Sequence, residues 1–202
     1  MTLWFLNGIK KGIKTEKNPD ESPFKPDYPS VLEGKSSYDC PTGAISNGTW
    51  IKEKCIFCGR CDLRPTGNQN IYNIHGKMPE IFKRSFYLYP IDSGTCGACN
   101  AELKSIFSPQ YDANRFNIFE AETPRHADAL VIMGVYTNGM EKIIEEAYNA
   151  MPDPKIVIAM GACTLSGGII GSGINKKFNV EIAGCPPTPY SIISAILRYR
   201  GD

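Results

Sequence analysis

The sequence lacks a long apolar run, an export signal and an excess of charge of either sign. No stretch approaches the roughly 18 consecutive apolar residues that a membrane-spanning helix needs. The apolar segment Leu3–Leu6 is too short for a signal peptide, lysines follow it rather than precede it, and no twin-arginine pair stands beside it. The 22 basic and 21 acidic residues nearly cancel, which excludes the charge footprint of a nucleic-acid-binding protein. We therefore expect a cytoplasmic protein that binds no nucleic acid.

The groups needed for substrate chemistry are also missing. No paired carboxylates, activated nucleophile or glycine-rich nucleotide loop is evident. His75 and His126 stand alone, without metal-ligand spacing, which favours surface or capping roles. What the chain does have is cysteine, eight residues in all: Cys40, Cys55, Cys58, Cys61, Cys96, Cys99, Cys163 and Cys185. The expected function depends on these thiols, not on catalysis by this chain alone.

Several kinds of site could use eight cysteines. Four disulfides are typical of short exported scaffolds, and this chain is neither short nor exported by its sequence. Structural zinc favours paired CxxC knuckles, whereas the triplet Cys55-Ile-Phe-Cys58-Gly-Arg-Cys61 is typical of an iron–sulfur cube. A thioredoxin-like redox pair would explain Cys96 and Cys99 only. Two [4Fe–4S] clusters account for all eight and are the favoured interpretation; the others stay open.

From residue 86 onward, apolar runs alternate with helical periodicity. Strands are predicted over 86–91, 115–119, 129–134, 155–160 and 180–183, and helices over 100–107, 140–151 and 189–198. Continuous apolar runs such as 129–134 indicate strands buried on both faces. This alternation predicts an α/β fold, a flavodoxin-like parallel sheet with helices on both faces.

Three cysteine-bearing loops follow predicted strands of this sheet. Cys96, Cys163 and Cys185 each lie just past a strand end, and Cys99 opens the helix after the first of them. Ligands of open α/β sheets bind beyond the carboxyl ends of the strands. Four soft thiolates with small neighbouring residues suit a [4Fe–4S] cluster. We therefore expect Cys96, Cys99, Cys163 and Cys185 to hold one cluster.

The other four cysteines match half of a bacterial ferredoxin signature. In that signature CxxCxxC is followed by a Cys-Pro whose cysteine binds the other cluster. Here Pro65 stands where the fourth cysteine would be, and residues 1–39 contain none. The Cys-Pro of the preceding half survives as Cys40-Pro41. The chain has thus lost all ligands of one cluster and kept a matched set for the other, namely Cys40, Cys55, Cys58 and Cys61.

The chain divides into three expected segments. Residues 1–36 contain several prolines and no sustained hydrophobic periodicity, so they are predicted to form an extended arm. Its lysines at 10, 11, 14 and 17 favour a solvated face, with an anionic membrane surface or a partner subunit as alternatives. Residues 37–80 form the small ferredoxin-like segment, which the cluster itself would organise. Residues 81–202 form the flavodoxin-like domain.

Several of these motifs together resemble a known family. Cys96xxCys99xxGlu102, Gly161xCys163 with Gly167-Gly168, and Gly184-Cys185-Pro186-Pro187 are similar to the small subunit of [NiFe] hydrogenases and to its homologue in complex I. The complex I homologue typically has two adjacent cysteines where this chain has CxxC, so the chain sides with the hydrogenase branch. The absence of an export signal and of a multi-cluster extension resembles the short small subunit of group 4 energy-converting hydrogenases. The segment around 40–61 resembles their ferredoxin-like subunit, here fused and reduced to one cluster.

The resemblance implies an electron-transfer subunit of a complex peripheral to the cytoplasmic side of the cell membrane. Its implied partners are a large subunit that carries any Ni–Fe centre, membrane subunits and a ferredoxin-like donor. The four C-terminal cysteines would hold the proximal cluster, with Glu102 at the large-subunit interface as a possible proton-transfer group. Position alone favours a Glu102 that stabilises a helix N-terminus. A quinone- or sulfur-reducing relative of complex I is the alternative, and a zinc-stabilised scaffold without redox function is a third hypothesis.

Overall fold

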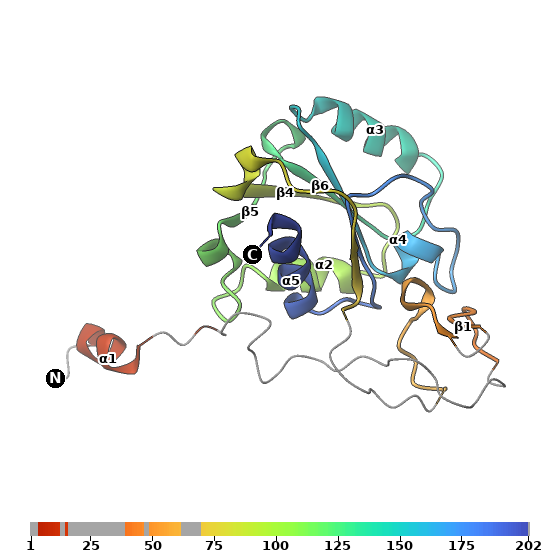
Figure 1. The fold of residues 1–202 in the computed structure, drawn as a ribbon, viewed down its shortest axis with the longest axis horizontal. Helices are drawn as coiled ribbons and strands as arrows, with labels where there is room; N and C mark the ends of the chain where they lie inside the picture. Colours follow the sequence, from red (N-terminus) through yellow and green to blue (C-terminus); the bar gives the residue numbers. More distant parts are fainter. Residues whose placement is uncertain (1–3, 13–14, 16–38, 47–48, 62–69, 202) are drawn as a thin grey trace.

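The computed structural model describes residues 4–12, 15, 39–46, 49–61 and 70–201, and a six-stranded sheet lies at its centre (Figure 1). The strand order is β3-β8-β7-β6-β4-β5. Their bounds are Tyr72–Ile74 for β3, Phe86–Asp92 for β4, Ile118–Glu120 for β5, Ala129–Met133 for β6, Ile156–Met160 for β7 and Val180–Ile182 for β8. All neighbours pair in parallel except β3, which runs antiparallel to β8 at one edge. Without β3, the order of the parallel strands is the flavodoxin-like one.

Helices cover both faces of this sheet. α2 (Ala98–Ser105) and α5 (Pro189–Arg200) lie on one face, and α3 (Met140–Ala150) lies on the other (Figure 1). Thr188 caps the N-terminus of α5, and Gly201 ends it in a left-handed conformation with φ 94°. The expected sheet with helices on both faces is confirmed.

The alternating directions of side chains along β6 explain its continuous apolar run. All five residues of the strand are buried. Ala129, Val131 and Met133 belong to the core beneath α2 and α5, whereas Leu130 and Ile132 belong to the core beneath α3. Because successive strand residues point to opposite faces, a strand covered on both sides needs an apolar residue at every position.

The structure differs from the sequence-based expectation at several elements. The strand expected over 115–119 is wrong in its first half, because a 3-10 helix, η4 (Ala113–Phe116), precedes β5 and Asn117 has a φ of 58°. Neither β3 nor the short helix α4 (Ala162–Ser166) was expected. Within the expected extended arm, Trp4–Lys11 form helix α1, none of whose residues is buried. Most of that arm lies outside the described residues.

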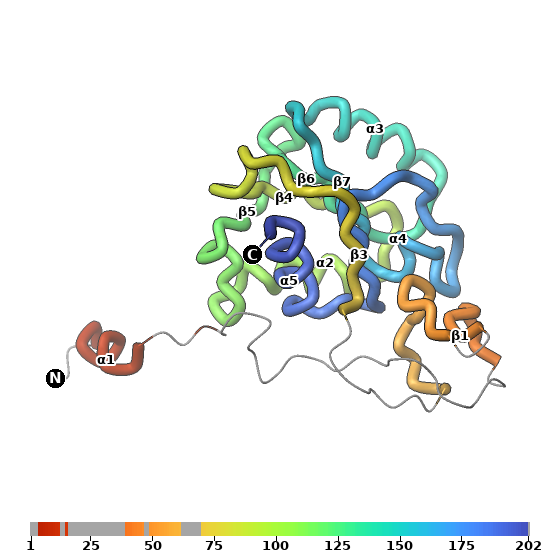
Figure 2. The backbone as a smooth tube through the Cα atoms, in the orientation of Figure 1, coloured from red at the N-terminus to blue at the C-terminus, as the bar shows by residue number. Residues whose placement is uncertain are grey.

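A small N-terminal part packs beside the sheet. It contains the two-stranded ladder of β1 (Ile45–Ser46) and β2 (Thr49–Trp50) and the 3-10 helix η2 (Lys52–Lys54), which packs against α4 (Figure 2). The edge strand β3 comes from the expected 37–80 segment yet pairs with β8 of the larger unit. The two expected segments therefore share one sheet.

Candidate metal-binding sites

The C-terminal cysteines gather at the carboxyl edge of the sheet. Cys96 follows β4, Cys99 lies on α2, Cys163 lies on α4 and Cys185 follows β8. Burial, together with the thiolate charges of Cys163, Cys185 and Cys96, raises the pKa of Cys99 to about 12. The four sulfurs are thus within electrostatic reach of one another, although they come from three distant loops. The expected placement of three of them just past strand ends is confirmed.

Backbone bonds and one glycine shape the space around these sulfurs. The N–H of Gly161 donates to the carbonyl of Ile182 at 2.8 Å, and that of Ala162 donates to the carbonyl of Gly184 at 2.8 Å, so the loops of Cys163 and Cys185 are tied together. Gly161 has a φ of 96°, and a Cβ added there would lie 2.7 Å from the Sγ of Cys99. The position accepts only glycine if Cys99 is to keep its place.

Asp92 organises the loop that carries Cys96. Its carboxylate accepts bonds from the N–H groups of Gly94 and Thr95 at 2.9 and 2.8 Å, from the Thr95 hydroxyl at 2.8 Å and from the Asn100 amide at 2.7 Å. Burial acts to raise the pKa of Asp92, but these hydrogen bonds outweigh it and lower the pKa. The carboxylate at the end of β4 therefore fixes both the turn before Cys96 and the first turn of α2.

The N-terminal cysteines are arranged around a turn and a loop. Burial acts to raise the pKa of Cys40, but hydrogen bonds from Thr42 and from the backbone at Ala44 and Ile45 lower it overall. Several backbone N–H groups directed at one sulfur form an environment that favours a thiolate. Burial raises the pKa of Cys55, and the charges of Cys61 and Cys40 add to that rise.

These shifts bring Cys40, Cys55 and Cys61 into one group. Cys58, in the same loop as Cys55 and Cys61, is exposed. All eight cysteines are free thiols, so no described pair forms a disulfide. The loop that carries the triplet turns through positive φ angles at Phe57 (53°) and Gly59 (70°).

Trp50 places a buried indole N–H beside this group. Its Nε1 has no partner that meets hydrogen-bond geometry among the described residues. The same N–H still acts to lower the pKa of Cys55, which places it near that sulfur. The indole N–H of Trp50 therefore lies near the sulfur of Cys55 but forms no hydrogen bond of standard geometry with it. A sulfur acceptor at that point would satisfy this donor.

The two cysteine groups lie next to each other. The charge of Cys55 contributes to the raised pKa of Cys185, after burial and after the charges of Cys163 and Cys96. A Cβ added to Gly168 would lie 3.4 Å from the Sγ of Cys163 and 3.9 Å from Cγ2 of Ile56. Ile56, which directly follows Cys55, therefore lies close to Gly168 in the loop after Cys163.

The donor sets fit [4Fe–4S] clusters. Each set offers soft sulfur ligands. Burial and, after it, the charges of neighbouring thiols raise the pKa of Cys55, Cys99, Cys163 and Cys185, and bound iron would offset both effects. Among the described residues, no group of three or more His, Cys, Asp or Glu side chains is close enough to hold a single metal ion. A cubane binds one thiolate at each iron corner, so it holds its ligands further apart than one ion does. The unbonded indole N–H of Trp50 suits such a sulfur-rich group, and the glycine at 161 leaves room for the ligand sulfur of Cys99.

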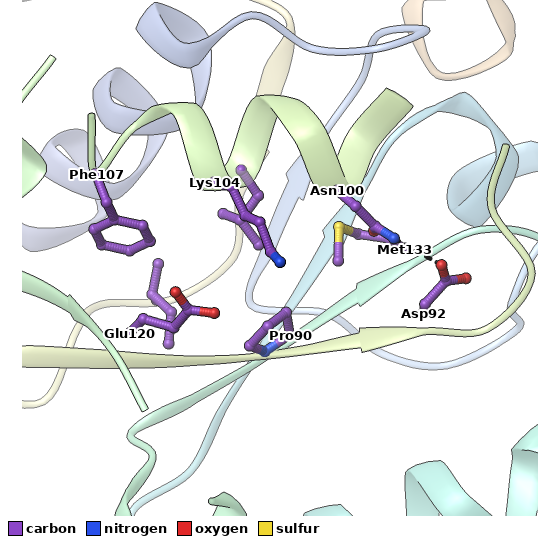
Figure 3. A pocket seen from close by; sticks show the side chains of 9 residues that line it. Pro90, Asp92, Asn100, Lys104, Phe107, Glu120 and Met133 are labelled. Carbon is purple, nitrogen blue, oxygen red and sulfur yellow. Dashed lines mark hydrogen bonds between the residues drawn. The ribbon is translucent and has the colours of Figure 1, made fainter. Parts of the chain in front are cut away.

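A mainly apolar cavity of about 220 Å³ lies beside the first cysteine loop (Figure 3). It lies between α2 and β4, and its lining includes the charged side chains of Asp92, Lys104 and Glu120. Glu102 does not line it. Glu102 lies half-buried on α2, one turn after Cys99. The structure thus places Glu102 near the C-terminal cysteines without giving it a contact that identifies its role.

Several residues of these sites were missed by sequence reasoning. Asp92 could have been found, because Asp-Ser-Gly-Thr at a strand end is typical of a side-chain-stabilised turn. Trp50 and Ile56 carried no such signal, because tryptophan and isoleucine are ordinary core residues and the contact of Ile56 at Gly168 lies far away in the sequence. Within the described residues, no helix has the length and apolar character to cross a membrane.

Comparisons with known proteins identify the family of the chain. Residues 96–199 match the family model described as NADH ubiquinone oxidoreductase, 20 kDa subunit, a range that contains the C-terminal cysteines and excludes the N-terminal ones. Formate hydrogenlyase subunit 7 of Escherichia coli is 39% identical over 61% of this chain and 52% of its own length. The probable membrane-bound hydrogenase subunit mbhJ of Pyrococcus furiosus is 32% identical over 65% of this chain and 86% of its own. The NAD(P)H-quinone oxidoreductase subunit K of Picosynechococcus sp. is 38% identical over 56% of this chain and 50% of its own.

Proposed function

The chain belongs to the family of the 20 kDa subunit of NADH:ubiquinone oxidoreductase, and from this premise we propose that it is the iron–sulfur electron-transfer subunit of an energy-converting [NiFe] hydrogenase-like complex. Members of this family are oxidoreductase subunits of hydrogenase and complex I-type assemblies. The chain spans about half the length of two relatives named above. The activity of the whole complex is therefore part of the proposal.

The observation that carries the proposal is the proximity of the two cysteine groups. Cys185 of one set and Cys55 of the other are within electrostatic reach, and Ile56 packs at Gly168 between them. A protein with one redox group exchanges electrons at one surface, whereas two adjacent groups let electrons arrive at one surface and leave at another. The arrangement therefore supports a relay between an outside donor and a second subunit.

We assign the ligands as the sequence predicts. Cys96, Cys99, Cys163 and Cys185 would hold a proximal [4Fe–4S] cluster, and Cys40, Cys55, Cys58 and Cys61 a second one. When bound, each cluster supplies a one-electron redox centre. The chain's own residues fix the ligand loops: Asp92 holds the turn before Cys96, Gly161 leaves room at Cys99, and the backbone at Ala44 and Ile45 surrounds Cys40.

The partners follow from the two ends of this relay. The C-terminal site would face a large subunit with any Ni–Fe centre, with Glu102 at that interface as a proton-transfer group. The N-terminal site would receive electrons from a ferredoxin-like donor. The complex would sit on the cytoplasmic side of the cell membrane through other, membrane-embedded subunits.

A second candidate function is a quinone- or sulfur-reducing complex related to complex I. The similarity to a quinone oxidoreductase subunit K favours it, while the similarity to mbhJ and to the formate hydrogenlyase subunit favours hydrogenase. The partner large subunit decides between them, because nickel requires its own cysteine pairs in that chain. Co-purification and metal analysis of the complex would distinguish the two.

Metal analysis and electron paramagnetic resonance (EPR) of anaerobically purified protein test the cluster assignment. We expect about eight iron atoms per chain, four for each cluster, and two reducible cubane signals. Cys40→Ser should remove one signal and Cys163→Ser the other. Stoichiometric zinc without iron would overturn the redox function, and survival of both signals in Cys40→Ser would overturn the ligand set of the second cluster.

A further inference from the structure

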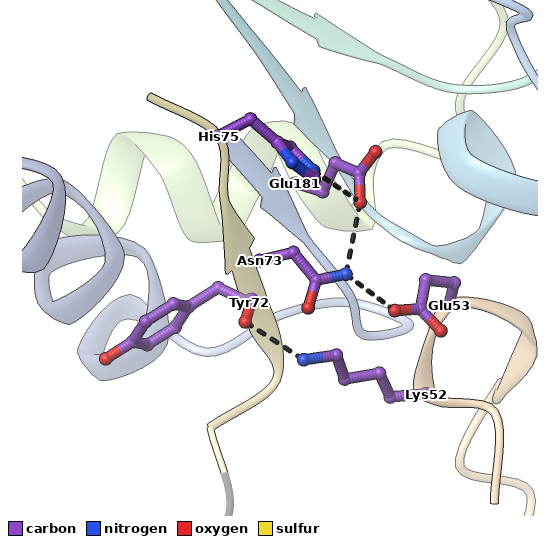
Figure 4. Close-up of polar contacts among 6 residues, drawn as sticks. All are labelled: Lys52, Glu53, Tyr72, Asn73, His75 and Glu181. Carbon is purple, nitrogen blue, oxygen red and sulfur yellow. Dashed lines mark hydrogen bonds and ion pairs between the residues drawn. The ribbon is translucent and has the colours of Figure 1, made fainter. Parts of the chain in front are cut away.

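A polar contact joins the N-terminal cysteine segment to the edge of the sheet (Figure 4). The amide nitrogen of Asn73 on β3 donates to Glu53 of η2 at 2.7 Å and to Glu181 of β8 at 3.1 Å. Glu181 is also 3.5 Å from Nε2 of His75. Because a side-chain amide carries two N–H donors, one Asn can serve both carboxylates at once. Three elements far apart in the sequence are thus tied together by one side chain.

Lys52 adds a second tie at the same place. Its ammonium donates to the carbonyls of Tyr72 at 2.9 Å and Asn70 at 3.4 Å. The carbonyl of Ile71 and the N–H of His75 form backbone hydrogen bonds toward β8, which runs antiparallel to β3. Because hydrogen-bonded residues alternate along such a pair, the carbonyls of Tyr72 and Asn70 point away from β8. Burial lowers the pKa of Lys52, and the nearby charges of Glu53 and Glu181 act against that shift. Lys52 thus lies among the carboxylates that Asn73 bridges, and it offsets part of their repulsion.

An apolar contact supports the polar one. Trp50 and Phe57 pack against Ile71 and Ala183, together with Leu165 of α4. Ile71 and Ala183 are each only 1% exposed. The residues just before and just after η2 therefore both pack against the larger unit. Cys55 directly follows η2 in the chain.

We propose that Asn73 is a positioning residue that fixes the separation of the two cysteine sites by tying Glu53 to Glu181. This inference rests on the proposed function, because it concerns the separation of the two clusters that we assign to the two cysteine sites. Glu53 lies two residues before Cys55, and Glu181 lies on the strand that leads to Cys185. A bond between the two carboxylates through Asn73 therefore sets the distance between two cysteine loops that lie close together, since a Cβ added to Gly168 would lie 3.4 Å from the Sγ of Cys163 and 3.9 Å from Ile56.

Asn73→Asp in the full-length chain tests this proposal. The change removes both donors and places a third carboxylate between two others, so η2 should move away from β8. The readout is EPR of the fully reduced protein. We expect magnetic interaction between the two clusters in the unaltered chain, and its loss in the variant, with two independent signals and unchanged iron content.

Two further variants keep the experiment decisive. Asn149→Asp on the exposed surface of α3 makes the same chemical change far from the contact and should leave the interaction intact. Glu53→Gln combined with Asn73→Asp exchanges donor and acceptor and should restore at least part of the interaction. An unchanged interaction in Asn73→Asp, or loss of a cluster that the double variant does not restore, would overturn the inference. An unaltered chain without iron would instead overturn the proposed function.

A second inference comes from the unbonded indole of Trp50. Its buried Nε1–H lacks a partner among the described residues, and its ring packs edge-on against Phe57 at 6.1 Å, whose own N–H donates to the Sγ of Cys55 at 3.4 Å. Hydrogen bonds to cluster sulfur are among the factors that set the reduction potential. We infer that Trp50 donates to a sulfur of the second cluster and raises its potential, because a donor stabilises the more negative, reduced state.

Trp50→Phe removes the N–H while keeping a ring against Phe57. In an EPR-monitored redox titration, the midpoint potential of the second cluster should fall while that of the proximal cluster stays unchanged. Trp4→Phe, at an exposed position, is the control. Protein labelled with nitrogen-15 tryptophan should also show hyperfine coupling of one indole to the second cluster. An unchanged potential or an absent coupling would overturn this role.

Discussion

The two cysteine sites are built by different means. The C-terminal site sits on the ends of parallel strands whose residues are almost wholly buried, such as β6 and β7. The N-terminal site has a two-stranded ladder, a 3-10 turn and a small apolar contact around Ile71. A cluster bound at the first site would take its geometry from the fold, whereas a cluster bound at the second would have to supply part of the order itself. The two sites should therefore fail in different ways.

The largest effect that separates the two sites is expected from Gly161→Ala. The new Cβ would lie 2.7 Å from the Sγ of Cys99, at a φ of 96° that alanine rarely adopts. We expect loss of the proximal EPR signal and of about half the iron, with the second signal retained. Gly201→Ala is the control, because it also has a positive φ of 94° but no described atom within 4 Å of the new Cβ. Equal loss of both signals would mean that the sites are not independent.

A smaller effect is expected from Ile56→Ala, which loosens the contact between the sites. Ile56 is half-buried, so losing its side chain should cost about 1 kcal/mol of docking free energy. Hydrogen exchange should become faster over residues 49–61 and stay unchanged in β6 and β7. Ile170→Ala, at a position that is 60% exposed, is the control and should leave hydrogen exchange unchanged in both regions. Faster exchange throughout the sheet would show that the N-terminal segment does not open separately.

The smallest effect is expected from Asp92→Asn, and it depends on pH. The folded-state pKa of Asp92 is lowered, so its stabilisation is present above the ordinary carboxyl pKa and is lost as pH falls through the folded-state value. Because Asp92 is exposed, the difference from wild type should stay below about 1 kcal/mol. Urea unfolding of the cluster-free chain should show this difference from pH 7 to about 5 and a decline below about pH 4. A difference that grows on acidification would contradict this sign.

The sequence was sufficient for the elements that share one strong signal. Val131 and Ile158 lie in continuous apolar runs, so β6 and β7 were predicted nearly to their ends, and the cysteine loops after β4, β7 and β8 followed from them. β3 was missed because Tyr72-Asn73-Ile74 is too short and mixed to show a pattern, and its place depends on pairing with β8. β5 was misplaced because left-handed Asn117 interrupts the apolar run before it.

The sequence indicated the candidate ligands of the two sites but not the residues that support them. Cysteine spacing is a local signal, and it identified every candidate thiol. The bridge from Asn73 to Glu53 and Glu181 joins residues of ordinary type, which become informative only when the fold brings them together. The same is true of Trp50, whose unbonded N–H is visible only in three dimensions.

The position of Lys52 has a consequence for the solubility of the chain. β3 is an edge strand, and its outward carbonyls would otherwise be free to pair with a strand of another molecule. Lys52 occupies the carbonyl of Tyr72 in β3 and that of Asn70, two residues before the strand begins its pairing with β8 at Tyr72. The segment that carries one cysteine set therefore also closes the open edge of the sheet. A chain in which this segment is displaced would expose that edge to pairing with another molecule.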